Sequence, residues 1–114
     1  MIDKIELLTE ILLDPNARID ERDDAAMDLG EEFTDDSVLE VLIQVACNPN
    51  EVEIILNSCG EAIGKIWVKR KMFNKKIYSS LTGTSRYGVY IIIKSQQPEW
   101  VKEYELEKTA DFSD

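Results

Sequence analysis

Nine acidic side chains and one arginine lie in the segment "DERDDAAMDLGEEFTDD", residues 20–36. Clustered carboxylates can hold a divalent cation, and a pair of them can catalyse hydrolysis when burial keeps one protonated. A third use is electrostatic, because a concentrated negative surface attracts a basic partner. The segment also contains a small apolar stripe at helical spacing, which predicts a helix with the acids on its other side. The stripe consists of Ala25, Ala26, Leu29 and Phe33.

The most metal-like stretch begins with Asp14-x-Asn16, which is faintly similar to a calcium-binding loop. Such a loop requires Gly at its sixth position and Glu at its twelfth. Here those positions hold Ile19 and Ala25, and the fifth holds Arg18. The sequence therefore predicts no metal and no other cofactor.

Catalytic motifs are also missing from the sequence. Histidine, the commonest general base, does not occur. There is no phosphate-binding glycine loop and no Ser-centred nucleophile motif. The two cysteines, Cys47 and Cys59, are too far apart for a CxxC motif, and each lies in an apolar helical pattern. We interpret them as reduced core thiols, and we expect no enzymatic activity.

The net charge of −10 is unevenly distributed along the chain. Residues 1–64 contain 17 acids and 3 bases, whereas residues 65–94 contain 8 bases and no acid. In the basic part, "KIWVKRKMFNKK" interleaves cations with Trp67 and Phe73 and could bind phosphates and stack bases. Alternatively, these cations complement a helix C-terminus and Trp67 is a core residue. Because most of the surface would repel a duplex, we expect no direct nucleic-acid binding.

Length and hydropathy predict a single domain over residues 1–114. The longest apolar run, residues 89–93, is far shorter than the ~20 residues that span a bilayer. The first residues carry more acid than base, which is the wrong charge for a secretory signal. We therefore expect a cytoplasmic location and no membrane partner.

Apolar spacing predicts an all-α fold whose first four helices position the acidic residues. These helices run over residues 2–13, from an Asp20 cap to about Phe33, from an Asp35 or Asp36 cap through "SVLEVLIQVA", and from an Asn50–Glu53 capping box to about Val68.

The remaining third of the chain has a looser pattern. Asn74 can cap a helix over "KKIYSSL", and Pro98 suits the first turn of a last short helix on which Trp100 packs back with Val101 and Tyr104. Residues 86–94 have high strand propensity. We nevertheless predict a helix there, because the preceding helical pair needs a third pair to cover its open side. The tail "KTADFSD" is expected to fray.

A shift of 34 residues superposes two units of the sequence without a gap. Small residues recur in it, and these allow the two helices of a hairpin to approach closely. A two-helix repeat of this period is typical of solenoids, so we predict a short right-handed α-solenoid of about three hairpins with a C-terminal capping helix. The hairpins would be residues 3–33, 37–68 and a degenerate 72–106. The matched pairs include Asp14-Pro15-Asn16 with Asn48-Pro49-Asn50, Leu12 with Ala46, Ala25 with Cys59, Leu29 with Ile63, Gly30 with Gly64, and Phe33 with Trp67.

The pattern Arg22-x-x-Ala25-Ala26-x-x-Leu29-Gly30, with the "NPN" turn and "CGEAIGKI", resembles the HEAT-like repeats of many small bacterial proteins over residues 3–67. The second unit departs from that family, because its helix-opening Val-Arg pair is missing and Leu56 takes the place of Arg22. A buried Arg–Asp link between units is therefore expected to be lost there.

"RDDAAMDLGEEFTDD" followed by "SCGEAIGKIW" is similar to a group of immunity proteins of bacterial contact-dependent growth inhibition and related polymorphic toxin systems. The resemblance implies stoichiometric binding to a cognate basic toxin domain, often a nuclease. Whether a third cellular protein joins through the toxin stays open. The alternative is a generic HEAT-like adaptor or scaffold.

In a solenoid the second helix of each pair lines the concave surface, so the helices at 21–33 and 51–68 would be neighbours there. We predict that their outward residues bind the partner, with acids supplying steering charge and Met27, Ile54 and Trp67 supplying apolar anchors. The predicted partner-binding residues are Asp24, Met27, Asp28, Glu31, Asp35, Asp36, Ile54, Ser58, Glu61, Lys65 and Trp67.

Overall fold

The computed structural model describes residues 2–106, and every regular element within them is an α-helix. The all-α prediction is confirmed for this range, including the helix predicted over 86–94. The structure has a Cα radius of gyration of 13.4 Å and extents of 44 × 27 × 21 Å along its principal axes. The seven helices of residues 2–106 are α1 (Lys4–Leu13), α2 (Ile19–Glu32), α3 (Asp36–Ala46), α4 (Glu53–Arg70), α5 (Lys75–Ser80), α6 (Gly83–Gln96) and α7 (Glu99–Glu103).

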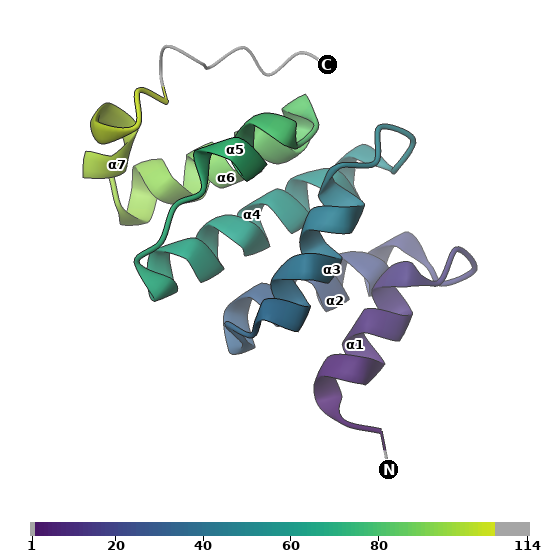
Figure 1. The fold of residues 1–114 in the computed structure, drawn as a ribbon. Coiled ribbons are helices and arrows are strands. Elements are labelled where there is room, and N and C mark those ends of the chain that lie inside the picture. The colour runs from purple at the N-terminus through teal and green to yellow at the C-terminus, as the bar shows by residue number, and fades with distance from the viewer. Residues whose placement is uncertain (1, 107–114) are drawn as a thin grey trace.

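Two layers organise these helices, with α1, α3 and α5 in front of α2, α4 and α6 (Figure 1). Each front helix packs on the next helix of the chain, so the layers are joined by the hairpins α1–α2, α3–α4 and α5–α6. In the rear layer α4 lies between α2 and α6 and packs extensively against both. This row of second helices presents the candidate surface described below.

Small residues bring neighbouring helices of the rear layer together. Gly30 of α2 faces Ala62 of α4, where a Cβ atom built on the glycine would lie 2.5 Å from the alanine Cβ. Gly88 of α6 lies so close to α4 that a Cβ would be 2.6 Å from the carbonyl oxygen of Asn57. The prediction of close approach is confirmed, but its location was wrong. It was expected between the two helices of one hairpin. These contacts instead join the second helices of successive hairpins, α2 to α4 and α4 to α6.

Arg22 points inward and is 8% exposed. Its Nε donates to the Leu12 carbonyl at 2.8 Å, and its Nη1 and Nη2 donate to the Glu51 carboxylate at 3.0 and 2.6 Å. The first hairpin is thereby tied to the loop that precedes α4. The partner is a glutamate of the next unit, and Leu56, at the equivalent place in that unit, is buried and makes no such link.

Of the predicted side-chain caps, the Asn74 cap is confirmed, whereas the Asp20 cap and the Asn50–Glu53 box are not. The Asn74 side chain accepts from the Ile77 N–H at 2.9 Å, as predicted. The predicted Asp20 cap is wrong, because α2 already begins at Ile19 after Arg18. The predicted Asn50–Glu53 capping box is also wrong. Asn48 accepts the Asn50 N–H at 3.0 Å to close the turn, and α4 begins after Val52 without a side-chain cap. The other two side-chain caps are Asp3 for α1 and Thr82 for α6.

An aromatic cluster closes the C-terminal end of the core. The ring of Phe73 lies 5.2 Å from that of Trp67 and 4.5 Å from that of Tyr104, and Trp100 also contacts it. Trp100 is buried, so the predicted packing of the last helix against the core is confirmed. The expected fraying of residues 108–114 lies outside the described residues. None of the helices within residues 2–106 is long and apolar enough to cross a membrane.

Candidate protein-binding surface

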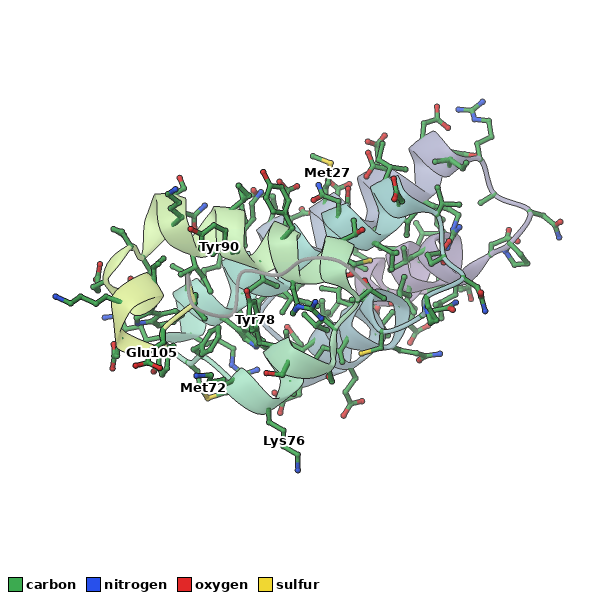
Figure 2. All side chains as sticks on the ribbon, turned by 90° about the horizontal axis from the view of Figure 1, so that it is seen from above. Met27, Met72, Lys76, Tyr78, Tyr90 and Glu105 are labelled. Atoms are coloured by element: carbon green, nitrogen blue, oxygen red, sulfur yellow. The ribbon has the colours of Figure 1, made fainter. Side chains whose placement is uncertain are left out.

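The outer face of the rear layer lies opposite the buried stripes of α2, α4 and α6. On α2, Leu29 is completely buried whereas Met27 is 44% exposed, as expected for residues about 200° apart around a helix. Figure 2 shows Met27 projecting from this side of the molecule. We call this surface the outer face, and its members from the predicted set are Asp24, Met27, Asp28, Glu31, Ile54, Glu61 and Lys65.

Negative charge gathers on the α2 part of the outer face, and Lys4 of α1, which pairs with Glu32, offsets only part of it. Helix α2 contains seven acidic residues, and its single arginine is the inward Arg22. Asp24 and Asp28 are exposed, and neither forms an ion pair with any residue that the structure describes. They are four residues apart, so the two carboxylates lie one above the other and repel each other. Met27 lies beside them on the same helix.

Among the predicted acids on the outer face, Glu31 is the one that forms an ion pair with a described residue. The Lys65 Nζ lies 2.5 Å from Glu31 Oε1 and joins α4 to α2. The hydrogen bond from Lys65 holds the pKa of Glu31 below its usual range. Both residues belong to the predicted site, but their charges largely cancel, so their first role is to tie the two helices together.

Asp35 and Asp36 do not join the outer face. Asp35 is the N-cap residue of α3, in the turn after α2. The Asp36 carboxylate accepts from Arg70 Nη1 at 2.7 Å and lines a groove beside α3 and α5. The prediction that their charge adds to that of Asp24 and Asp28 on one surface was wrong, because the chain turns into the front layer at this point.

Two predicted contact residues are buried. Ser58 was expected to face outward, but it is 5% exposed and its hydroxyl donates to the Asp23 carboxylate across the α2–α4 contact. Trp67 was considered as an anchor and is 2% exposed, within the aromatic cluster. The alternative interpretation of Trp67 as a core residue is confirmed. Neither side chain is therefore exposed on the outer face.

Helix α6 adds two apolar residues to the outer face that the sequence reasoning missed. Tyr87 is 46% exposed and Ile91 is 36% exposed, while Val89 between them is completely buried. The available signal was their i, i+4 spacing on the side opposite Val89. It was hidden because nearly every residue of this stretch is apolar. With Met27 and Ile54, these side chains give the outer face exposed apolar residues on all three helices.

The chemistry that this surface can perform is recognition. Among residues 2–106, no three acidic, cysteine or histidine side chains gather as a metal ion would require. Charge next to exposed apolar side chains steers a partner electrostatically and then holds it by burial. The fold and the surface together define an all-α protein with an acidic, partly apolar face. No family model, no curated protein and no solved structure matches the chain.

Proposed function

We propose that this protein is an immunity protein that binds and neutralises a cognate basic toxin domain of the nuclease class. The observation that carries the proposal is the exposed pair Asp24 and Asp28, unpaired beside the exposed Met27. A nuclease needs cations to hold phosphate, so a negative surface with apolar anchors can occupy the same positions on it.

The energetics favour a binding role over simple solubility. Like charges four residues apart destabilise an isolated helix by about 0.2–0.5 kcal/mol per pair. Solubility needs no such arrangement, since the same charge spread over the surface would serve. Electrostatic steering rewards it, because complementary charge can raise association rates towards ~10⁸–10⁹ M⁻¹s⁻¹. Fast capture is valuable when an incoming toxin must be bound before it acts. We therefore propose that this protein acts in the cytoplasm.

We further propose that the hairpins form a short right-handed α-solenoid of the HEAT-like kind, with units 3–33, 37–68 and 72–106. Contacts between residues about one repeat apart support it. Glu31 pairs with Lys65 and Asp36 pairs with Arg70, each 34 positions apart, and Asp23 bonds to Ser58, 35 positions away. A stacked repeat brings residue i beside residue i+34 in this manner. The outer face would then be the concave surface.

The experiment is expression of the toxin domain encoded directly upstream, with and without this protein. Wild-type protein should restore growth, and D24K/D28K should protect less well at equal abundance. The matched control E10K/E103K changes the net charge equally at two exposed sites outside the outer face. Equal killing with and without the wild-type protein would refute the immunity role.

A helical adaptor is the second candidate, because the molecule has another surface of different chemistry on its opposite side. The same experiment separates the two functions. An adaptor would bind the neighbouring protein, or another one, without protecting the cell.

A further inference from the structure

Three exposed lysines follow Arg70, one in the turn after α4 and two in the first turn of α5. The two cations before them have structural roles: Lys69 donates to the Gly30 and Glu31 carbonyls at 3.1 and 2.5 Å, and Arg70 pairs with Asp36. The three lysines are exposed, and no carboxylate in the described part of the chain forms an ion pair with them. They are Lys71, Lys75 and Lys76.

The turn after α4 holds Lys71 and Met72 in place. The Met72 N–H donates to the Trp67 carbonyl and the Lys71 N–H donates to the Val68 carbonyl, as in a Schellman motif. Lys71 has φ 54°, the left-handed conformation that this motif requires and that glycine usually supplies. Met72 is left 49% exposed at the edge of the front layer.

An open apolar groove lies beside this turn, with a volume of about 240 Å³. That is below the roughly 300–1,000 Å³ of a small-molecule pocket, but it can accept one or two large side chains. The charged residues of its lining are Asp36 and Glu40 of α3 and Arg70 of α4. Lys71, Lys75 and Lys76 lie outside this lining and are next in the sequence to its members Met72, Asn74 and Ile77. Its apolar lining consists of Leu39, Ile43, Trp67, Met72 and Ile77.

Base stacking, the mode considered for nucleic acid, is not accessible here. Trp67 is 2% exposed, and Phe73 is packed against the rings of Trp67, Tyr78, Trp100 and Tyr104. A single strand bound through stacking needs free aromatic faces. The combination of an apolar groove and flanking cations instead fits a peptide.

We propose that this groove binds an acidic amphipathic peptide segment of another protein. One or two large apolar side chains enter the groove, and carboxylates on the α5 side bind Lys71, Lys75 and Lys76. The negative α3 wall orients the segment, because it repels acids placed on that side. Figure 2 shows Met72 and Lys76 on the side opposite Met27, so this site is separate from the outer face and does not depend on the immunity role.

The test is selection of a display library of random peptides of about 12 residues on the full-length protein, followed by fluorescence anisotropy of the enriched peptides. Enriched sequences should be acidic, with large apolar residues at i and i+3 or i+4. K75E/K76E should weaken their binding about tenfold or more, as expected for lost charge pairs in a docking site. M72E, at an exposed position, should weaken binding through the apolar contact. The matched control K94E/K102E should bind within about twofold of wild type, since surface charges outside a site matter little.

Three results would overturn the proposal. One is the absence of any enriched peptide. Another is enrichment of peptides that lack acids, or that bind K75E/K76E and M72E as tightly as wild type. The third is binding of a single-stranded oligonucleotide that these variants abolish while no peptide is selected. Thermal unfolding of each variant confirms that it is folded before binding is measured.

Discussion

Arg22 and Ser85 each bind a carbonyl group at the same position of the 34-residue repeat, Leu12 in the first unit and Ala46 in the second. Arg22 Nε donates to the carbonyl of Leu12, near the end of α1, from the second helix of the same hairpin. Ser85 Oγ lies 3.0 Å from the carbonyl of Ala46, which ends α3 and corresponds to Leu12 after the 34-residue shift. The second unit has therefore replaced the internal arginine with a buried serine of the following hairpin.

Breaking the Arg22–Glu51 pair should destabilise the protein. Both side chains are largely buried, at 10% and 13% exposure, so Glu51→Gln would leave the guanidinium without its counter-ion. We expect a loss of about 2–4 kcal/mol in the free energy of unfolding, measured by urea denaturation at pH 7. The control Glu53→Gln, at an exposed position, should change it by less than about 0.5 kcal/mol.

The same pair predicts a pH dependence. The hydrogen bond from Arg22 lowers the pKa of Glu51, so the folded state releases that proton more readily than the unfolded chain. This stabilisation is complete above the unfolded pKa of about 4.3 and is lost as pH falls through the folded value. The stability difference between wild type and Glu51→Gln should therefore narrow below about pH 4.3. A constant difference down to acid unfolding would contradict the role given to Glu51.

The crossing of α4 and α6 should tolerate no added methyl group. Alanine normally stabilises a helix over glycine by about 0.5–1 kcal/mol. At Gly88 the new Cβ would lie 2.6 Å from the Asn57 carbonyl oxygen, and at Gly60 it would overlap the backbone of Ser85. We expect Gly88→Ala and Gly60→Ala to lose about 1–3 kcal/mol or more in thermal unfolding. Gly64→Ala should lose less, since its nearest neighbour, the Ile92 Cβ, is 3.0 Å away. Stabilisation by Gly88→Ala would show that the helices are farther apart than described.

Cys59 should be inert and should make the fold sensitive to alkali. It is completely buried, and burial raises its thiol pKa to about 12. At pH 8 an alkylating reagent should modify the half-buried Cys47 and leave Cys59 intact until urea unfolds the protein.

Because the unfolded thiol of Cys59 ionises near pH 8.5, the free energy of unfolding should fall as pH rises from about 8.5 towards 12. Tyr78, whose pKa burial also raises to about 12, adds to this loss above about pH 10. Cys59→Ala should show a shallower decline, and mass spectrometry of the labelled protein checks the order of reaction.

The sequence predicted the helical layout well because apolar periodicity and small residues act over short and regular distances. The 34-residue shift even anticipated real contacts, since Glu31 reaches Lys65. The helix at residues 86–94 was predicted against its strand propensity, because α4 needed cover, and α6 supplies it.

The errors arose where tertiary contacts decide the outcome. Glu51 pairs with Arg22, and α4 begins at Glu53, later than its cap pattern indicated. Ser58 lies at the edge of the buried stripe, where a small rotation decides between solvent and the Asp23 carboxylate. Tyr87 and Ile91 were missed because a run that is apolar on every side does not reveal which side is exposed.

The outer face is tested most directly by association kinetics with the toxin domain of the proposed function, in catalytically inactive form. The measured quantity is the association rate constant across about 20–500 mM salt, where screening weakens steering between exposed charges. For D24K/D28K we expect a rate about tenfold or more below wild type at low salt, with a flatter salt dependence. The control E10K/E103K should remain close to wild type. Equal rate constants for D24K/D28K and wild type at every salt concentration would contradict the assignment of partner binding to Asp24 and Asp28.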